Sequence, residues 1–80
     1  MKITETGSNY TVVEINDKLE ILFSYKTPVA GYQRGIGVIA GYFKTDKKWS
    51  VTTSKHINKY LKGITAIRIM PQEQIDKLAS

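Results

Sequence analysis

Cysteine is absent from these 80 residues, and proline occurs only twice. Without cysteine the chain can form neither a disulfide framework nor a thiolate zinc site, so its stability must come from packing. A chain of this length hides only about 60 to 65% of the surface that its unfolded form exposes, which leaves little room for a deep catalytic cleft. We therefore expect a single domain over residues 1–80, with a small core and no cofactor or metal.

Long apolar runs are also missing. Nowhere do about 18 uncharged apolar residues follow one another, which is the length that indicates a membrane span. The opening stretch MKITETGSNY has no apolar core behind its lysine, as a signal peptide would. The sequence thus predicts neither a signal peptide nor a membrane span, and we expect a cytoplasmic protein.

Acidic residues are scarce in the middle of the chain. The net charge is +5, and residues 1–20 carry two lysines against four acids, whereas residues 21–70 carry nine basic residues against Asp46 alone. Such a basic stretch favours an anionic partner, usually nucleic acid. Small basic domains that bind acidic proteins show the same imbalance, so an acidic protein partner is the alternative.

Two strands are predicted near the N-terminus. NYTVVEI at residues 9–15 is rich in β-branched and aromatic residues, and LEILFSY at residues 19–25 alternates apolar side chains at a period of two. Between them, residues 16–18 have the composition of a turn. The two strands are expected to form a hairpin.

A three-residue loop gives this hairpin its preferred register. It places Val13 opposite Ile21. It also places Ile15 opposite Leu19, so that apolar residues face each other, and we prefer it to a two-residue loop. Pro28 then has no N–H to donate to a ladder, which predicts a strand end or a sheet edge there. An exposed edge at that place would allow a homodimer as well as a monomer.

Glycines are spaced among β-forming residues in VAGYQRGIGVIAGYFKT, residues 29–45. This spacing suggests a second hairpin with bulges or a flexible tip. GIGVIAG comes close to a dinucleotide-binding fingerprint, but its third glycine is one place late and a strand pattern follows where a helix is needed, so we reject that reading. If Ile36, Val38 and Ile39 are exposed at a loop tip, they would suit a protein partner.

The pattern changes to a helix over residues 54–62. At about 100° per residue, Ile57, Tyr60 and Leu61 gather on one side. Gly63 is expected to end this helix. Thr52, Thr53 and Ser54 are all competent N-caps, and the sequence does not choose among them.

A last strand and a short helix complete the pattern. ITAIRIM at residues 64–70 has few polar residues, as expected for a strand that is covered on both faces. Pro71 opens a short C-terminal helix with Glu73 in its first turn. The order β-β-β-β-α-β-α predicts an α+β domain, in which a small curled antiparallel sheet or partial barrel of about five strands packs against one main helix.

The stretch KKWSVTTSKHINKYLKG, residues 47–63, is the most informative part of the chain, because it holds five lysines and no acid. A solvated helix face explains such a run on its own. Flat side chains beside the lysines, however, are what base stacking combined with phosphate attraction requires. The candidate residues for binding nucleic acid or another anion are Lys47, Lys48, Trp49, Thr53, Ser54, Lys55, His56, Lys59, Tyr60 and Lys62. Trp49 and Tyr60 can equally belong to the core.

The start of this helix offers a second idea of the same kind. Three hydroxyl residues and Lys55 stand at a helix N-terminus, where unpaired backbone N–H groups can bind one phosphate. Capping alone explains the hydroxyl groups equally well.

Little in the sequence indicates an enzyme. His56 is the single histidine, and the seven carboxylates show neither metal-ligand nor paired-acid spacing. A serine nucleophile with His56 as its base is compatible with the sequence, because triad members need not be neighbours, but no nucleophile-elbow motif supports it. We expect a protein that is not an enzyme.

LFSYKTPVA at residues 22–30 and YFKTDKKWSVTTSKHINKYL at residues 42–61 together resemble a family of small uncharacterised proteins encoded by bacteriophages and prophages. The run W-S-x-T-T-S-x-H-I-N is the most specific part of the likeness, and the glycine-rich part between them looks longer than the usual hairpin of that family. The resemblance implies a phage origin and no established activity. Small phage proteins are often nucleic-acid accessories or inhibitors of a host complex such as a defence system, and either would use a basic surface.

Overall fold

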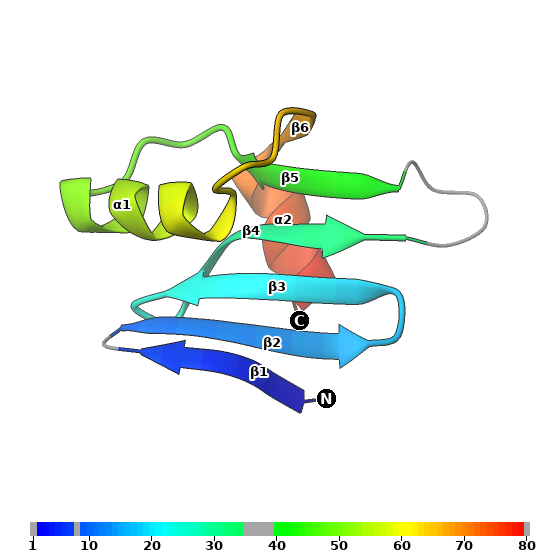
Figure 1. Ribbon diagram of the computed structural model, residues 1–80. Coiled ribbons are helices and arrows are strands. Elements are labelled where there is room, and N and C mark those ends of the chain that lie inside the picture. The colour runs from blue at the N-terminus through cyan, green and yellow to red at the C-terminus, as the bar shows by residue number, and fades with distance from the viewer. Residues whose placement is uncertain (1, 8, 35–39, 80) are drawn as a thin grey trace.

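A computed structural model describes residues 2–7, 9–34 and 40–79 of the chain, and within these ranges it shows one mixed sheet and two helices (Figure 1). The strands are β1 (Lys2–Gly7), β2 (Tyr10–Asn16), β3 (Leu19–Ser24), β4 (Thr27–Gln33), β5 (Gly41–Thr45) and β6 (Ile67–Met70), and the helices are α1 (Val51–Tyr60) and α2 (Gln72–Ala79). No helix in the described residues is long and apolar enough to cross a membrane.

The strands lie in the sheet in their order along the chain, from β1 to β6. Strands β1 to β5 pair antiparallel, whereas β6 runs parallel to β5. The α+β class is confirmed, but the sheet has six strands, is not fully antiparallel and does not close into a barrel. The parallel pair has a physical cause, because α1 carries the chain back along the sheet before β6 begins and a parallel partner needs such a crossover.

Strand β1 is not predicted by the sequence pattern. Each of its residues is exposed, because β1 lies at the edge of the sheet and neither of its faces is covered. Its residues therefore show no apolar periodicity, and periodicity is the signal by which a strand is recognised in a sequence.

The hairpin of β2 and β3 is confirmed, with one correction to its register. Val13 lies opposite Ile21 as predicted, but Leu19 pairs with Asn16. The register shifts between Glu14 and Asn16, so Ile15 has no direct partner in β3. The Asn16 side chain accepts a hydrogen bond from the backbone N–H of Lys18 at 2.8 Å, which favours the tighter turn.

Pro28 lies near the start of β4, so a strand end is present close to the predicted place, but β4 is not an edge strand. It pairs with β3 on one side and with β5 on the other, and its pairing with β5 extends over Ala30 to Gln33. Pro28 is tolerated because it lies beyond the part of β4 that pairs with β5. The sheet edges are β1 and β6 instead.

The second predicted hairpin is confirmed as β4 and β5. Gly31 is required inside it, because an added Cβ atom would lie 2.3 Å from the Glu20 carbonyl oxygen and 2.6 Å from the Phe43 ring. The predicted protein-contact residues Ile36, Val38 and Ile39 lie outside the described residues.

Each face of the sheet carries a core covered by one helix. Successive side chains of a strand point to opposite faces. On one face, Leu22 belongs to a cluster against which Ile57 of α1 packs. On the other face, Ile21 and Phe43 pack with Ile75 of α2. The two helices therefore lie on opposite sides of the sheet, and α2 passes behind β3 and β4 in Figure 1.

The main helix begins earlier than predicted, at Val51, and ends at Tyr60. Its N-cap is Ser50, whose side chain accepts a hydrogen bond from the backbone N–H of Thr53. None of the three predicted capping residues holds that position, because all three already lie inside the helix. Gly63 follows with a φ of 82°, a left-handed conformation that suits the predicted stop.

The last strand is shorter than predicted and is not covered on both faces. It spans Ile67–Met70 and forms an edge of the sheet, with Ile69 56% exposed and Met70 buried. Its apolar composition reflects one buried face and an outward-facing isoleucine. The C-terminal helix after Pro71 is confirmed, with Glu73 in its first turn.

Candidate functional site: a basic hollow beside helix α1

A hollow of about 340 Å³ lies between α1, the end of β5 and the loop that joins them. Lysines of β5 and of this loop line it, and we call it the basic hollow. Its lining is formed by Lys44, Thr45, Asp46, Lys47, Lys48, Trp49, Ser54, Ile57, Asn58 and Ile69. Of the predicted site residues, Lys47, Lys48, Trp49 and Ser54 are brought together here.

Trp49 is half-buried at this hollow and packs against the core cluster under α1. The Lys47 ammonium lies 4.5 Å from the centroid of its ring, which is a cation–π distance. The tryptophan is therefore partly core and partly a wall of the hollow. A flat ligand could stack on the ring face that Lys47 covers only if the lysine side chain moved aside.

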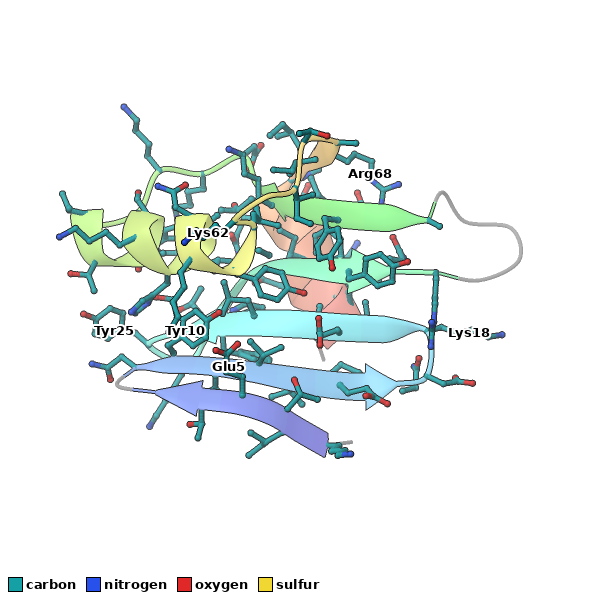
Figure 2. All side chains as sticks on the ribbon, viewed as in Figure 1. Glu5, Tyr10, Lys18, Tyr25, Lys62 and Arg68 are labelled. Atoms are coloured by element: carbon teal, nitrogen blue, oxygen red, sulfur yellow. The ribbon has the colours of Figure 1, made fainter. Side chains whose placement is uncertain are left out.

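Lys55 and Lys62 are exposed on the solvent side of α1 and of the turn after it. Figure 2 shows Lys62 at the C-terminal end of the helix. Within the described ranges, neither these two lysines nor Lys48 forms an ion pair with a carboxylate. Their charges therefore face water without neutralisation by the protein's own acids.

Two acids that could have neutralised this surface, Glu20 and Asp76, form hydrogen bonds elsewhere, whereas Asp46 lies at the basic hollow. The Glu20 carboxylate accepts a hydrogen bond from the Tyr60 hydroxyl at 2.7 Å. The Asp76 carboxylate accepts one from the side chain of Gln72 at 2.9 Å, and Gln72 also donates to the carbonyl of Pro28 at 2.7 Å. Asp46 is the acid that lines the basic hollow, and it also accepts a hydrogen bond from the first N–H of α2.

Three predicted site residues face the sheet and not the basic hollow. Thr53 is buried, and its hydroxyl lies 3.0 Å from the Ser24 hydroxyl. Nδ1 of His56 lies 2.7 Å from the same Ser24 oxygen. Tyr60 packs against the core and donates to Glu20. These side chains attach α1 to the sheet, which is a structural task.

Burial and hydrogen bonding raise the pKa of two tyrosines. Burial raises the pKa of Tyr60 far above its ordinary value, and the hydrogen bond to Glu20 raises it further. Burial also raises the pKa of Tyr10 to about 12, assisted by the negative charge of Glu5 and by the hydrogen bond to it at 3.4 Å. Both phenols therefore stay neutral and act as hydrogen-bond donors at physiological pH.

Lys59 lies on a different side of α1 from the basic hollow. Its ammonium is 4.6 Å from the centroid of the Tyr10 ring. It lines a second hollow of about 320 Å³ together with Glu5 and Glu20. Because two acids share this hollow, Lys59 is the lysine of the predicted set whose charge is most offset by neighbours.

Two features of this end of the molecule were not predicted from the sequence. One is that Lys44 lines the basic hollow, because it lies on the same face of the sheet as Tyr42 and points toward α1. The alternation of side chains along β5 could have indicated this face from the sequence. The turn at Tyr25 and Lys26 has left-handed backbone at both residues, with φ of 53° and 73°. Since neither residue is glycine or asparagine, the sequence carries no signal for it.

The lining of the basic hollow is rich in cationic side chains. No group of three or more histidine, cysteine, aspartate or glutamate side chains is positioned to hold a metal ion in the described ranges. The exposed lysines of the basic hollow offer charge and hydrogen-bond donors to an anion.

Comparison with known proteins assigns the chain to a family. A family model matches residues 1–77, and its description is a family of unknown function (DUF8033). No curated protein and no solved structure matches the chain.

Proposed function

Because the chain belongs to DUF8033, a family of unknown function, we propose its role from the geometry: it binds nucleic acid through the basic hollow and the lysines beside it. Lys47, Lys48, Lys55 and Lys62 contact phosphates, with Trp49 as a wall of the site. The observation that carries the proposal is the convergence of Lys44, Lys47 and Lys48 on one concave surface next to exposed lysines of α1. Lysines placed in this way are the electrostatic footprint of a phosphate-binding surface.

We propose a binding role and not a catalytic one. The one contact in the described residues that resembles a nucleophile and its base is Ser24 with His56, at 2.7 Å. Ser24 is only 2% exposed and shares its hydroxyl with Thr53, so a substrate cannot reach it. The contact is better explained as part of the attachment of α1 to the sheet.

The experiment is a titration with labelled DNA and RNA oligonucleotides at about 50 and about 200 mM salt. We expect log affinity to fall by roughly 0.7 to 0.9 per phosphate contact for each decade of salt. The double variant Lys47→Ala, Lys48→Ala should bind more weakly and lose roughly 2 units of that slope. Lys18→Ala is the matched control, because Figure 2 places Lys18 at the other end of the sheet.

Two outcomes count against nucleic acid as the partner. One is the absence of binding to any oligonucleotide. The other is an affinity that does not change with salt, because an interface built from lysines and phosphates must release counterions.

A second candidate is a host-directed inhibitor or interaction module that binds an acidic protein. Val51 of α1 is 73% exposed and Ile69 at the basic hollow is 56% exposed, so apolar groups stand beside the lysines. Such a mixture suits a protein surface. That the family is encoded by phages is also a proposal, which rests on the resemblance described above. A pull-down from host lysate after nuclease treatment tests this candidate, and recovery of no stoichiometric protein would count against it.

A further inference from the structure

The turn between β3 and β4 holds two consecutive residues in a conformation that side chains resist. Tyr25 and Lys26 have φ values of 53° and 73°, in the left-handed region where Cβ crowds the backbone. Turns of this shape ordinarily carry asparagine and glycine. The N–H of Tyr25 donates to the carbonyl of Asn9 at 3.1 Å, and Asn9 is itself left-handed at 58°. This hydrogen bond joins the two loops at this end of the sheet, and the strain lies at Tyr25 and Lys26, because asparagine adopts the left-handed conformation readily.

This strained turn holds an aromatic ring at the surface. Tyr25 is 49% exposed. Its ring lies 6.0 Å from the His56 ring, centroid to centroid. His56 is held in turn by the hydroxyl of Ser24 and by an edge-on contact with Tyr10 at 5.4 Å. The Tyr25 ring is thus supported from behind by side chains that α1 and the sheet fix in place.

A hollow of about 490 Å³ opens beside this ring. It is lined by Asn9, Thr11, Phe23, Tyr25 and Lys26. Phe23 and Tyr25 give it apolar walls, Asn9 supplies an amide, and Lys26 supplies a positive charge. This combination fits a flat heteroaromatic group attached to an anion, which is the chemistry of a nucleotide.

We propose that Tyr25 is the base-stacking platform of the protein and that its ligand is a single-stranded nucleic acid, with Lys26 on the adjacent phosphate. The inference rests on the proposed function and adds the strand type and the stacking residue. A base can stack on a side chain only when it is free of its own duplex. Of the stacking residues predicted from the sequence, Trp49 has Lys47 over its ring and Tyr60 faces the core.

The Tyr25 ring lies beside α1, which carries part of the basic surface, whereas Phe23 of the same hollow faces the α2 side of the sheet. The Tyr25 ring lies 6.0 Å from the His56 ring of α1, and the exposed Lys55 directly precedes His56 in that helix. Figure 2 shows Tyr25 near α1, at the opposite end of the sheet from Lys18. The proposal requires that a single strand bound at the basic hollow extends past Lys55 to the Tyr25 ring.

The test compares binding of an oligothymidine strand and of a DNA duplex of equal charge to variants at Tyr25. Tyr25→Asn removes the ring and suits the left-handed backbone, so the fold is kept, as circular dichroism will check. We expect it to lower affinity for the single strand by roughly tenfold or more and to leave the salt slope unchanged. Tyr25→Phe should retain affinity. Lys26→Asn should reduce the slope by roughly 1, and Lys18→Ala should change neither quantity.

The outcomes separate this inference from the proposed function. If Tyr25→Asn binds the single strand as tightly as the original protein while Lys47→Ala, Lys48→Ala weakens it, the stacking site is wrong and the proposed function stands. Equal losses for single strand and duplex would also overturn stacking. If the original protein binds no oligonucleotide, both proposals fail, and a host protein whose capture depends on Tyr25 then becomes the occupant.

Discussion

Tyr60 illustrates how one side chain can be read in two ways at the scale of the residue. In the sequence it stands among lysines and resembles a stacking group. In the structure its ring packs on the core and its hydroxyl donates to Glu20 at 2.7 Å. Helical periodicity already contained this outcome, because Tyr60 lies three residues after the inward-facing Ile57. The neighbouring charges made the other interpretation attractive.

The raised pKa values of Tyr60 and Tyr10 predict a loss of stability in alkaline solution. A folded-state pKa above the unfolded value of 10.0 stabilises the fold below pH 10, and that stabilisation is lost as the pH rises from about 10 through about 12. We expect the urea midpoint to fall over this range. Tyr60→Phe should cost about 2 kcal/mol at neutral pH, because Glu20 loses its donor, and should show a shallower alkaline decline. Parallel declines in the two proteins would contradict this explanation.

At the scale of the element, α1 depends on a residue outside the predicted helix. Ser50 caps it, and the hydroxyl residues that looked like caps lie within its first turn and a half. One of them, Thr53, uses its backbone N–H to complete the cap and its hydroxyl to reach Ser24. The choice among adjacent hydroxyl residues is made by the direction in which the helix packs, which the local sequence does not specify.

The capping assignment makes a direct prediction. Ser50→Ala should lower the free energy of unfolding by about 1 kcal/mol, because an N–H of the first turn loses its acceptor. Thr52→Ala is the matched control, since Thr52 is exposed inside the helix and alanine favours helix, so stability should stay equal or rise slightly. Thermal unfolding followed by circular dichroism measures both. A larger loss for Thr52→Ala than for Ser50→Ala would mean that the helix begins elsewhere.

At the scale of the whole molecule, the sheet is stabilised from both sides by different means. The face under α2 is apolar, with Ile21, Phe43 and Met70 packed on Ile75. The face under α1 combines apolar packing with the Tyr60–Glu20 hydrogen bond and the Ser24–His56 hydrogen bond. Because the apolar core is small, α2 should contribute a large share of the total stability although it is short.

The variant Ile75→Ala tests how much of the total stability α2 contributes. Ile75 is fully buried, so its truncation should cost about 2 to 5 kcal/mol, a large fraction of the roughly 4 to 12 kcal/mol expected for a domain of this size. Leu78→Ala is the control on the same helix, because Leu78 is only half-buried and should cost less. Urea denaturation measures the difference. Equal small losses for both variants would show that α2 adds little to the fold.

The sequence by itself determined the local features of this protein: the pairing of Val13 with Ile21, the inward side of α1 at Ile57, the helix end at Gly63 and the exposure of the lysines. These follow from residue periodicity and backbone preference, which act over a few positions. Tertiary structure alone decided that β6 runs parallel to β5 and that an exposed ring stands on a strained turn. Such features depend on contacts between segments far apart in the chain, and no local pattern records those contacts.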